Sequence, residues 1–510
     1  MTRRSVSQPA PSASGLRWVR LSPGMAHADY EAVIGLEVHV QLLTETKMFC
    51  RCPNRFGAPQ NTLVCPVCLG YPGTLPVPNR HAVDLAAKLA LALECEVHPA
   101  SVFARKNYFY PDLPKGYQIS QFDQPLAEGG RLPLAQHDKT VRLERLHLEE
   151  DAGKLLHEAP GGGALPGQSL VDFNRCGVPL VEIVSRPDMA SAAEAQDYLQ
   201  TLHQLLLYTG TSDGNMEEGS LRCDANVSVR VRGETKLGTK AEVKNVNSFR
   251  NVARAVEHEI ERQVAVLESG GRVAQETRSF DADSGLTRLL RSKEEAHDYR
   301  YFPEPDLPPL ILAAERIVAL QAALPELPWQ RRARFVSQYG LPAGDAQVLT
   351  TARELADYFE AAAAALPANP KGIANWVMGE MLRDVKERKV ELGATIAPQR
   401  LAALVALVDA GKLSNSAAKE VFAAVAATGD DPAAAVERLG LGQVSDTSQI
   451  EEWIEEVVEQ NAGPVAQYRA GKTQTIGFLV GQVMKRSGGR AEPKTVQQLL
   501  KQALEREPVA

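Results

Sequence analysis

The sequence of 510 residues predicts an α+β protein in which a domain built on a mixed or antiparallel sheet is followed by all-α domains. Residues 29–310 contain short stretches of alternating apolar and polar side chains, separated by Gly and Pro, as expected for strands joined by turns. The remainder is rich in Ala and carries repeated helix-capping signals. Between the two regions, segment 303–309 contains too many prolines for a helix or a central strand.

We therefore expect four parts along the chain: a disordered tail over 1–28, the sheet-containing domain over 29–310, a helical domain over 311–435 and a helical tail domain over 436–510. The first 28 residues lack the apolar stretch of a secretory signal, and no apolar run approaches the ~20 residues of a membrane span. The expected location is cytoplasmic, without a membrane partner. Translation could start at Met1 or at Met25.

The overall composition is that of a globular protein, with 44% hydrophobic and 23% charged residues. The net charge of -7 argues against a protein that coats nucleic acid over its whole surface, but a local basic face stays possible.

Four cysteines lie close together after the first predicted strand, as C-x-C, a gap of twelve residues and C-x-x-C: Cys50, Cys52, Cys65 and Cys68. Two tight turns that each present two sulfurs suit a tetrahedral zinc ion. Disulfide pairing is the alternative, but the remaining three cysteines are scattered and odd in number, as in a reducing compartment. The spacing therefore favours a structural zinc knuckle.

The first predicted strand, residues 34–42, has apolar residues at alternate positions, which places Glu37 and His39 together on the opposite face. Residues 221–229 alternate in the same way and put Arg222, Asp224 and Asn226 on one side. A polar face of this kind could simply be solvated. The repetition in several strands instead favours a site.

Three further segments extend the pattern. Residues 240–245 set Glu242 beside Lys244, and these would pair with the strand over 221–229. Residues 145–151 end in the consecutive carboxylates Glu149, Glu150 and Asp151, whereas residues 178–184 embed the single Glu182 among apolar side chains. A carboxylate inside an apolar strand is costly without a partner, and Mg²⁺ is a natural one. The set therefore predicts a magnesium site and phosphoryl chemistry.

Capping signals define the helices. Asn247 and Ser248 precede a helix predicted over 249–268, and its N-terminus beside Lys244 is a potential anion site. Farther along, Pro398 and Asp431-Pro432 start helices, and Ser448 with Glu451 predicts a capping box. Residues 469–510 carry a basic run that is either a solvated helix face or a surface that faces RNA.

Several motifs resemble those of the B subunits of aspartyl/glutamyl-tRNA amidotransferases. They occupy residues 33–42, 147–154, 172–175, 177–180, 221–226, 244–249 and 298–306, and the resemblance runs from about residue 29 to the end. It implies a cradle-shaped catalytic domain followed by a helical domain and a helical tail that contacts tRNA. The chain lacks a complete Walker A motif and an amidase signature.

The resemblance also implies a reaction. ATP would phosphorylate the side-chain carboxylate of misacylated Glu-tRNA(Gln), Asp-tRNA(Asn) or both, and ammonia would then displace the phosphate. The ammonia would come from the amidase-type glutaminase of the same enzyme, its A subunit, with the small C subunit as a further partner, and segment 113–121 would lie near the ammonia exit. The cofactors would be ATP, Mg²⁺ and Zn²⁺.

Residue roles follow from the same match. The implied catalytic residues are Glu37, His39, Glu149, Glu150, Arg222 and Lys244. Besides the four cysteines, the expected metal-site residues are Glu37, His39, Glu150, Asp151, Glu182, Asp224 and Glu242. The residues expected to bind the cofactor are Asp172, Asn174, Asn226, Asn245 and Ser248.

Two other functions stay open. One is an RNA-binding module with a zinc knuckle and no catalysis, which leaves the strand-face carboxylates unexplained because they would repel phosphate unless a metal ion lay between. The other is a self-contained metal-dependent phosphohydrolase, which would hydrolyse ATP without charged tRNA.

Overall fold

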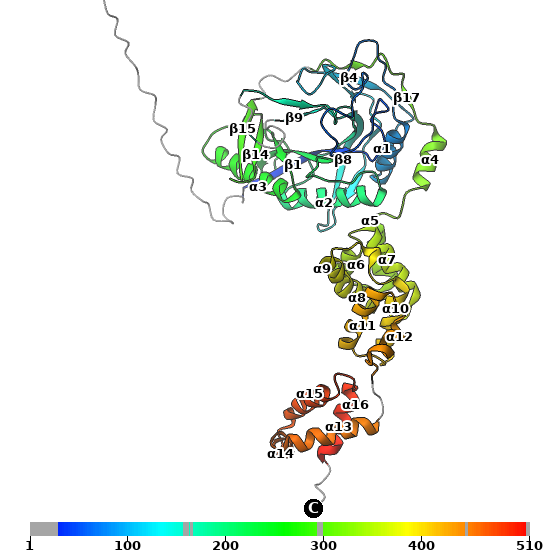
Figure 1. Ribbon diagram of the computed structural model, residues 1–510. Helices are drawn as coiled ribbons and strands as arrows, with labels where there is room; N and C mark the ends of the chain where they lie inside the picture. The colour runs from blue at the N-terminus through cyan, green and yellow to red at the C-terminus, as the bar shows by residue number, and fades with distance from the viewer. Residues whose placement is uncertain (1–28, 157–162, 164–166, 293–298, 444–446, 506–510) are drawn as a thin grey trace, which may run out of the picture. The chain divides into compact units, whose positions relative to one another are not determined.

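The computed structural model describes residues 29–156, 163, 167–292, 299–443 and 447–505, so the tail predicted over 1–28 lies outside the described residues (Figure 1). The chain divides into two compact units that meet at Leu324 and Pro325. The sequence pattern places this boundary near residue 310. The difference arises because helix α4 (Ala314–Ala322) packs on α1 (Arg80–Ala92) of the first unit, where Arg316 pairs with Asp84 at 2.9 Å.

A ten-stranded mixed sheet forms the centre of the first unit, in the order β15-β14-β13-β12-β1-β11-β8-β6-β2, with β7 paired to β8. All its pairs are antiparallel except β13 with β14, which are connected through helix α3 (Phe249–Glu268). The strands are β1 Tyr30–Gln41, β2 Glu96–Val97, β6 Ala127–Glu128, β7 Arg131–Pro133, β8 Thr140–Glu150, β11 Pro179–Ser185, β12 Leu221–Val231, β13 Ala241–Val246, β14 Glu276–Asp281 and β15 Leu286–Ser292. The α+β prediction is therefore confirmed.

One face of this sheet is apolar and carries the core. On β1, Ile34, Leu36, Val38 and Val40 are all at most 1% exposed. Helices α1, α2 (Ala192–Thr209) and α3 pack along this side (Figure 1). Burial of these alternate residues fixes the register of β1, since a shift by one residue would turn its polar set into the core.

Helix α3 has the bounds that its capping residues predict. The Ser248 hydroxyl accepts a hydrogen bond from the Asn251 amide at 3.2 Å, which satisfies one of the free donors of the first turn.

Three smaller sheets complete the strands of the described residues. The first has the order β16-β4-β5, and two pairs complete the set, β10-β9 and β17-β3. Their strands are β3 Ala100–Ser101, β4 Phe103–Asn107, β5 Tyr117–Gln121, β9 Lys154–Leu156, β10 Leu170–Asp172, β16 Phe302–Pro303 and β17 Leu310–Ile311.

The second unit is helical and contains two separate hydrophobic cores. The first core includes residues from Phe335 to Ala435 and involves α5 Pro328–Tyr339, α6 Ala343–Leu349, α7 Arg353–Ala365, α8 Pro370–Trp376, α9 Leu382–Arg388, α10 Pro398–Asp409, α11 Asn415–Thr428 and α12 Pro432–Leu439, with a π-helical turn at Val377–Met381. The second lies among α13 Thr447–Gln460, α14 Ala462–Arg469, α15 Ile476–Arg486 and α16 Pro493–Glu505.

The predicted starts at Pro398 and Asp431-Pro432 are confirmed, because both prolines occupy first-turn positions. The capping box at Ser448 is wrong. Helix α13 already includes Thr447, so Ser448 lies within the helix and cannot be its N-cap. No helix in the described ranges combines the length and the apolar character that a membrane crossing requires.

Candidate functional site

The face of the large sheet opposite the helices is polar, and its charged groups come from five neighbouring strands. Strand pairing sets Glu37 opposite Asp224 and His39 opposite both Arg222 and Glu182. Because directly paired residues point to the same side of a sheet, the alternating patterns of separate segments merge into one surface.

A group with the composition of a metal site occupies the middle of this surface. His39, Glu149 and Glu182 each offer a ligand atom, and these atoms lie within 4.8 Å of one another. The Nε2 atom of His39 is 3.3 Å from Glu182 and 3.7 Å from Glu149. His147 borders the same carboxylates, with its Nε2 atom 3.5 Å from Glu182. One imidazole and two carboxylates form a donor set that fits Mg²⁺ or Mn²⁺.

The electrostatics of this group favour a bound cation. Burial would raise the pKa of Glu182, but the charges of His147 and His39 hold it far below its ordinary range. Burial would likewise raise the pKa of Glu149, and its hydrogen bond with His147 lowers it overall. Burial would lower the pKa of His39, yet the two carboxylates raise it. Both glutamates are therefore ionised at neutral pH and attract positive charge.

Two fixed cations flank the group. The Arg222 guanidinium lies 2.8 Å from Asp151, which also accepts a hydrogen bond from Gln41. On β13, Lys244 contacts Asp224 and lies 3.2 Å from Glu242. Burial would lower the pKa of both cations, but the neighbouring carboxylates raise it, so both stay charged. Asp151, Asp224 and Glu242 are therefore ion-paired rather than gathered with His39.

A cavity of about 580 Å³ opens on this surface. Its lining includes many of the predicted site residues, namely Glu37, His39, Glu182, Asp224, Asn226, Glu242 and Lys244. Asn226 donates a hydrogen bond to Glu37 at 2.9 Å and thereby fixes the orientation of that carboxylate. A single space thus joins the carboxylate–imidazole group to Lys244, with room for a nucleotide-sized ligand.

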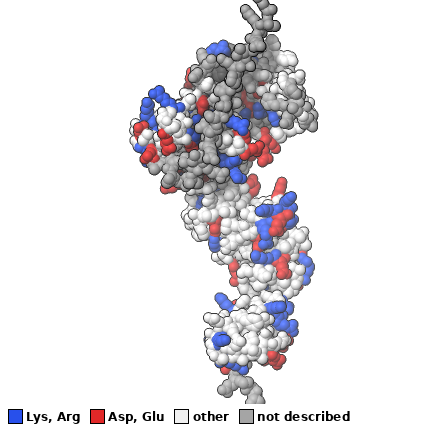
Figure 2. All heavy atoms as spheres, turned by 90° about the vertical axis from the view of Figure 1, so that its left-hand side faces the viewer, with Lys and Arg blue, Asp and Glu red and all other residues white. Residues whose placement is uncertain are grey.

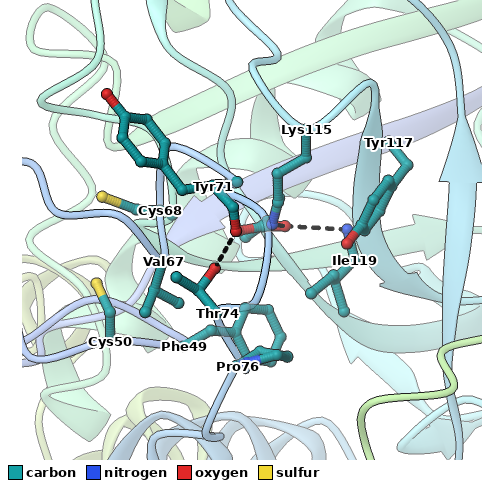
Figure 3. Close-up of a pocket in the computed structure, with 13 residues that line it drawn as sticks. Phe49, Cys50, Val67, Cys68, Tyr71, Thr74, Pro76, Lys115, Tyr117 and Ile119 are labelled. Carbon is teal, nitrogen blue, oxygen red and sulfur yellow. Dashed lines mark hydrogen bonds and ion pairs between the residues drawn. The ribbon is translucent and has the colours of Figure 1, made fainter.

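Glu150 does not belong to this group. Side chains alternate along β8, so Glu150 points away from Glu149, to the opposite side of the strand. There it contacts Lys115 and accepts a hydrogen bond from the Ile119 amide at 3.0 Å. Figure 3 shows this second pocket, with Lys115 and Tyr117 on one side and the sulfurs of two cysteines on the other.

Four of the five residues expected to bind the cofactor lie away from the large cavity. Asp172 and Asn174 accept hydrogen bonds from the backbone of the loop over 58–63 and tie it down. Asn245 follows Lys244 on β13, so it points to the other side and donates to the Phe280 carbonyl. Ser248 serves as the N-cap of α3. Among these five, Asn226 alone lines the cavity.

The four cysteines of the predicted knuckle converge. The sulfurs of Cys50, Cys52, Cys65 and Cys68 all lie within 4.8 Å of one another, and none forms a disulfide. Sulfurs bound tetrahedrally at about 2.3 Å from zinc lie about 3.8 Å apart, so this arrangement fits the ion. A hydrogen bond from Cys50 lowers the pKa of Cys68 to about 5, and nearby Lys47 contributes, so a thiolate is available as a ligand.

Comparison with known proteins agrees with this geometry. Residues 32–318 match the GatB/GatE catalytic domain, and residues 357–504 match the GatB domain. The chain belongs to the GatB family. A relative from Myxococcus xanthus is 54% identical over 94% of this chain and 100% of its own length. A relative from Geotalea daltonii is 54% identical over 94% of this chain and 100% of its own length. A relative from Chlorobium phaeobacteroides is 53% identical over 93% of this chain and 99% of its own length. All three are named as the B subunit of an aspartyl/glutamyl-tRNA(Asn/Gln) amidotransferase.

In this member of the GatB family, the basic run near the C-terminus is distributed over α14–α16. Arg486 pairs with Glu456 of the acidic helix α13 at 2.5 Å, and Arg490 lies over the Trp453 ring. In contrast, Lys472, Lys485, Lys494 and Lys501 are exposed. Figure 2 shows that the visible face of this part is mostly uncharged, with charged side chains mainly toward its edges. The run is therefore partly used within the fold.

Sequence reasoning missed two polar residues that line the large cavity, His147 and Lys106. His147 alternates with Leu146 and Leu148 on β8, so the same pattern that identified Glu149 could have identified it. Lys106 lines the cavity from β4, in a separate small sheet, and burial would lower its pKa whereas Glu149 raises it. No local signal marks Lys106, because its proximity to Glu149 depends on how the sheets pack.

Proposed function

We propose that this chain activates and amidates the side-chain carboxylate of a misacylated tRNA. ATP phosphorylates the carboxylate of Glu-tRNA(Gln), Asp-tRNA(Asn) or both, and ammonia then displaces phosphate to give the amide. The observation that carries the proposal is the single cavity that joins His39 and Glu182 to Lys244, because phosphoryl transfer needs a cation site and fixed positive charge side by side.

His39, Glu149 and Glu182 are the residues that would hold Mg²⁺. When bound, this ion supplies a positive charge that neutralises phosphate oxygens and orients them for displacement. Glu37 lines the same cavity and is held by Asn226, so it provides a further oxygen donor toward substrate or ion-bound water. Of the metal-site residues expected from sequence, Glu150 has a different place, beside Lys115.

The cationic side chains have a separate role. Lys244 faces the cavity and remains protonated, so it binds phosphate oxygens and stabilises the charge that develops as the phosphoryl group moves. Arg222 is held by Asp151 at the border of the group and contributes positive potential without needing to move. Both cations are held by carboxylates before any substrate arrives, which limits reorganisation during the reaction.

The cysteine knuckle has a structural role in this proposal. A zinc ion with four sulfur ligands has no open position for a substrate. Its cysteines lie between β1 and α1, and two of them, Cys50 and Cys68, border the pocket of Glu150 and Lys115, so zinc would fix the loops that shape this pocket.

The nitrogen donor requires a partner. The sequence contains no amidase signature, so we propose that an amidase-type glutaminase, the A subunit of the enzyme, releases ammonia and that the small C subunit completes the assembly. Ammonia would reach the activated carboxylate from the side of segment 113–121, where Lys115 and Glu150 meet. The names of the relatives, which are B subunits, support a multi-subunit enzyme.

The test is ATP-dependent amidation, assayed with misacylated Glu-tRNA(Gln) and Asp-tRNA(Asn) separately. The rigorously purified chain should form product with ammonium but not with glutamine, and co-purified partners should restore use of glutamine. Failure to amidate either tRNA with ammonium, in protein that binds ATP, would refute the proposal. Rapid ATP hydrolysis without charged tRNA would instead indicate a phosphohydrolase.

A further inference from the structure

An aromatic wall borders the cavity. Phe122, Tyr299 and Tyr301 contribute to the cavity lining. Phe122 and Tyr301 are stacked face to face, with ring centroids 4.2 Å apart and an angle of 7° between their planes. Tyr299 meets Tyr301 edge-on at 6.0 Å. The proposed phosphoryl transfer uses none of these rings.

The wall has a defined scaffold. Phe122 directly follows β5, and Tyr301 directly precedes β16, whereas β4 lies between these strands in the small sheet. The Asn107 amide at the end of β4 donates to the Tyr299 carbonyl at 3.0 Å. Segments almost 180 residues apart in sequence are thereby brought into one stack.

The stack is incomplete. Tyr301 covers one face of Phe122, yet 54% of Phe122 remains exposed. More than half of Phe122 is therefore left uncovered. An aromatic ring of this kind, bordering a cavity and already stacked on one side, offers a platform for another planar ring.

The wall is close to the reacting groups. Lys106 lies 5.0 Å from the centre of the Tyr299 ring and also lines the cavity. Its charge interacts both with Tyr301 and with Glu149 of the carboxylate–imidazole group. A nucleotide whose base stacked on Phe122 would therefore share the cavity with a cation and with the proposed metal site.

We propose that Phe122, backed by Tyr301, is a stacking platform for an adenine ring. This inference rests on the proposed function, in which two adenosine-bearing substrates meet: ATP, and the 3′-terminal adenosine of tRNA that carries the amino acid. Stacking suits both, since every base has a π-face and an unpaired 3′ end is free to stack.

The test compares Phe122→Ala with Phe122→Tyr in the full-length chain together with any partner that co-purifies. The alanine variant removes the platform and the tyrosine variant keeps it. Loss of a base-stacking partner weakens binding about five- to hundredfold. The tyrosine variant should remain within about threefold of the unmodified protein. Phe56→Ala is the matched control, since Phe56 is 71% exposed and does not line the cavity.

Two binding measurements identify which adenine uses the platform. One is the affinity for a non-hydrolysable ATP analogue, and the other is the affinity for tRNA with and without its 3′-terminal adenosine. If the tRNA base stacks on Phe122, removal of that adenosine and Phe122→Ala should weaken binding by similar factors, and their effects should not add. If the ATP base stacks there, only the analogue should bind more weakly.

Unchanged affinity for both ligands in a folded Phe122→Ala variant would overturn the inference. Equal weakening in Phe122→Tyr would overturn it too, because the ring is then not acting through its face. These outcomes are independent of the amidation assay. A protein that failed to amidate but lost adenine binding in Phe122→Ala would refute the proposed reaction and keep the platform.

Discussion

Replacement of Lys47 by methionine should weaken zinc binding without lowering the stability of the zinc-free protein. Lys47 is 0% exposed, and its ammonium lies 3.8 Å from the Cys68 sulfur and 3.4 Å from the Phe173 carbonyl. Four thiolates around one Zn²⁺ leave a net charge of about -2, for which this buried cation is a fitting counterion. Methionine keeps much of the length and removes the charge.

The structure sets the size of the effect. Two unit charges 3.8 Å apart attract each other by about 4 kcal/mol at an effective dielectric constant of about 20. Desolvation of the buried ammonium offsets a large part, which leaves about 1–3 kcal/mol in favour of the zinc-loaded state. The zinc dissociation constant of Lys47→Met should therefore rise about 5- to 150-fold.

The assay is competition for zinc with a metallochromic chelator of known affinity, combined with thermal unfolding of the zinc-loaded and zinc-free forms. Lys236→Met is the control, because Lys236 is exposed in the turn after β12. The zinc-free variant should be as stable as the zinc-free parent, since an apolar side chain replaces a cation whose counterion is gone. Unchanged zinc affinity, or equal destabilisation of both forms, would show that Lys47 acts by packing and refute the electrostatic reasoning.

Three other predictions concern other parts of the chain. Glu182→Gln keeps the shape of the side chain but removes one carboxylate from the His39 group, so amidation at saturating tRNA should fall at least about 100-fold, whereas Glu128→Gln, in the exposed β6 position, should leave it unchanged. Ser248→Ala removes the N-cap of α3 and should cost about 1 kcal/mol in the free energy of unfolding by denaturant, with Ser269→Ala at the exposed C-cap as its control. Deletion of 447–510 should weaken tRNA binding and flatten its dependence on salt, because phosphate contacts that release counterions are lost; an unchanged slope would mean that the exposed lysines are only solvated. The cut falls before α13, since a cut at residue 469 would divide the core that α13 shares with α16.

Much of the polar face could be predicted because its signal is local. Alternation along β1, β12 and β13 places Glu37, Asp224 and Lys244 on one side, and the pairing of these strands brings the sides together. The bounds of α3 were likewise available from its cap. The sequence could not show which charged groups form ion pairs with one another. Asp151 pairs with Arg222 instead of joining His39, because pairing between strands distant in sequence decides which side chains meet.

The errors have physical causes too. The run of three carboxylates after Leu148 resembles one ligand set in the sequence, although alternation along a strand must separate Glu149 from Glu150. The prolines suggest a domain boundary, but the chain continues beyond them to pack α4 on α1, and no proline pattern encodes that contact. The aromatic wall depends on the small sheet, whose strands are too short to be recognised by periodicity.

Strand β8 serves two compartments with consecutive residues, Glu149 toward the large cavity and Glu150 toward the pocket beside the cysteines. Insertion or deletion of one residue ahead of this pair would turn each carboxylate to the opposite side of the strand in a single step. A shift in the register of β8 would therefore change the large cavity and the pocket beside the cysteines together. The end of β8 should therefore tolerate substitutions far better than changes in length, and any loop grafted or shortened near it must conserve the count of residues back to Thr140.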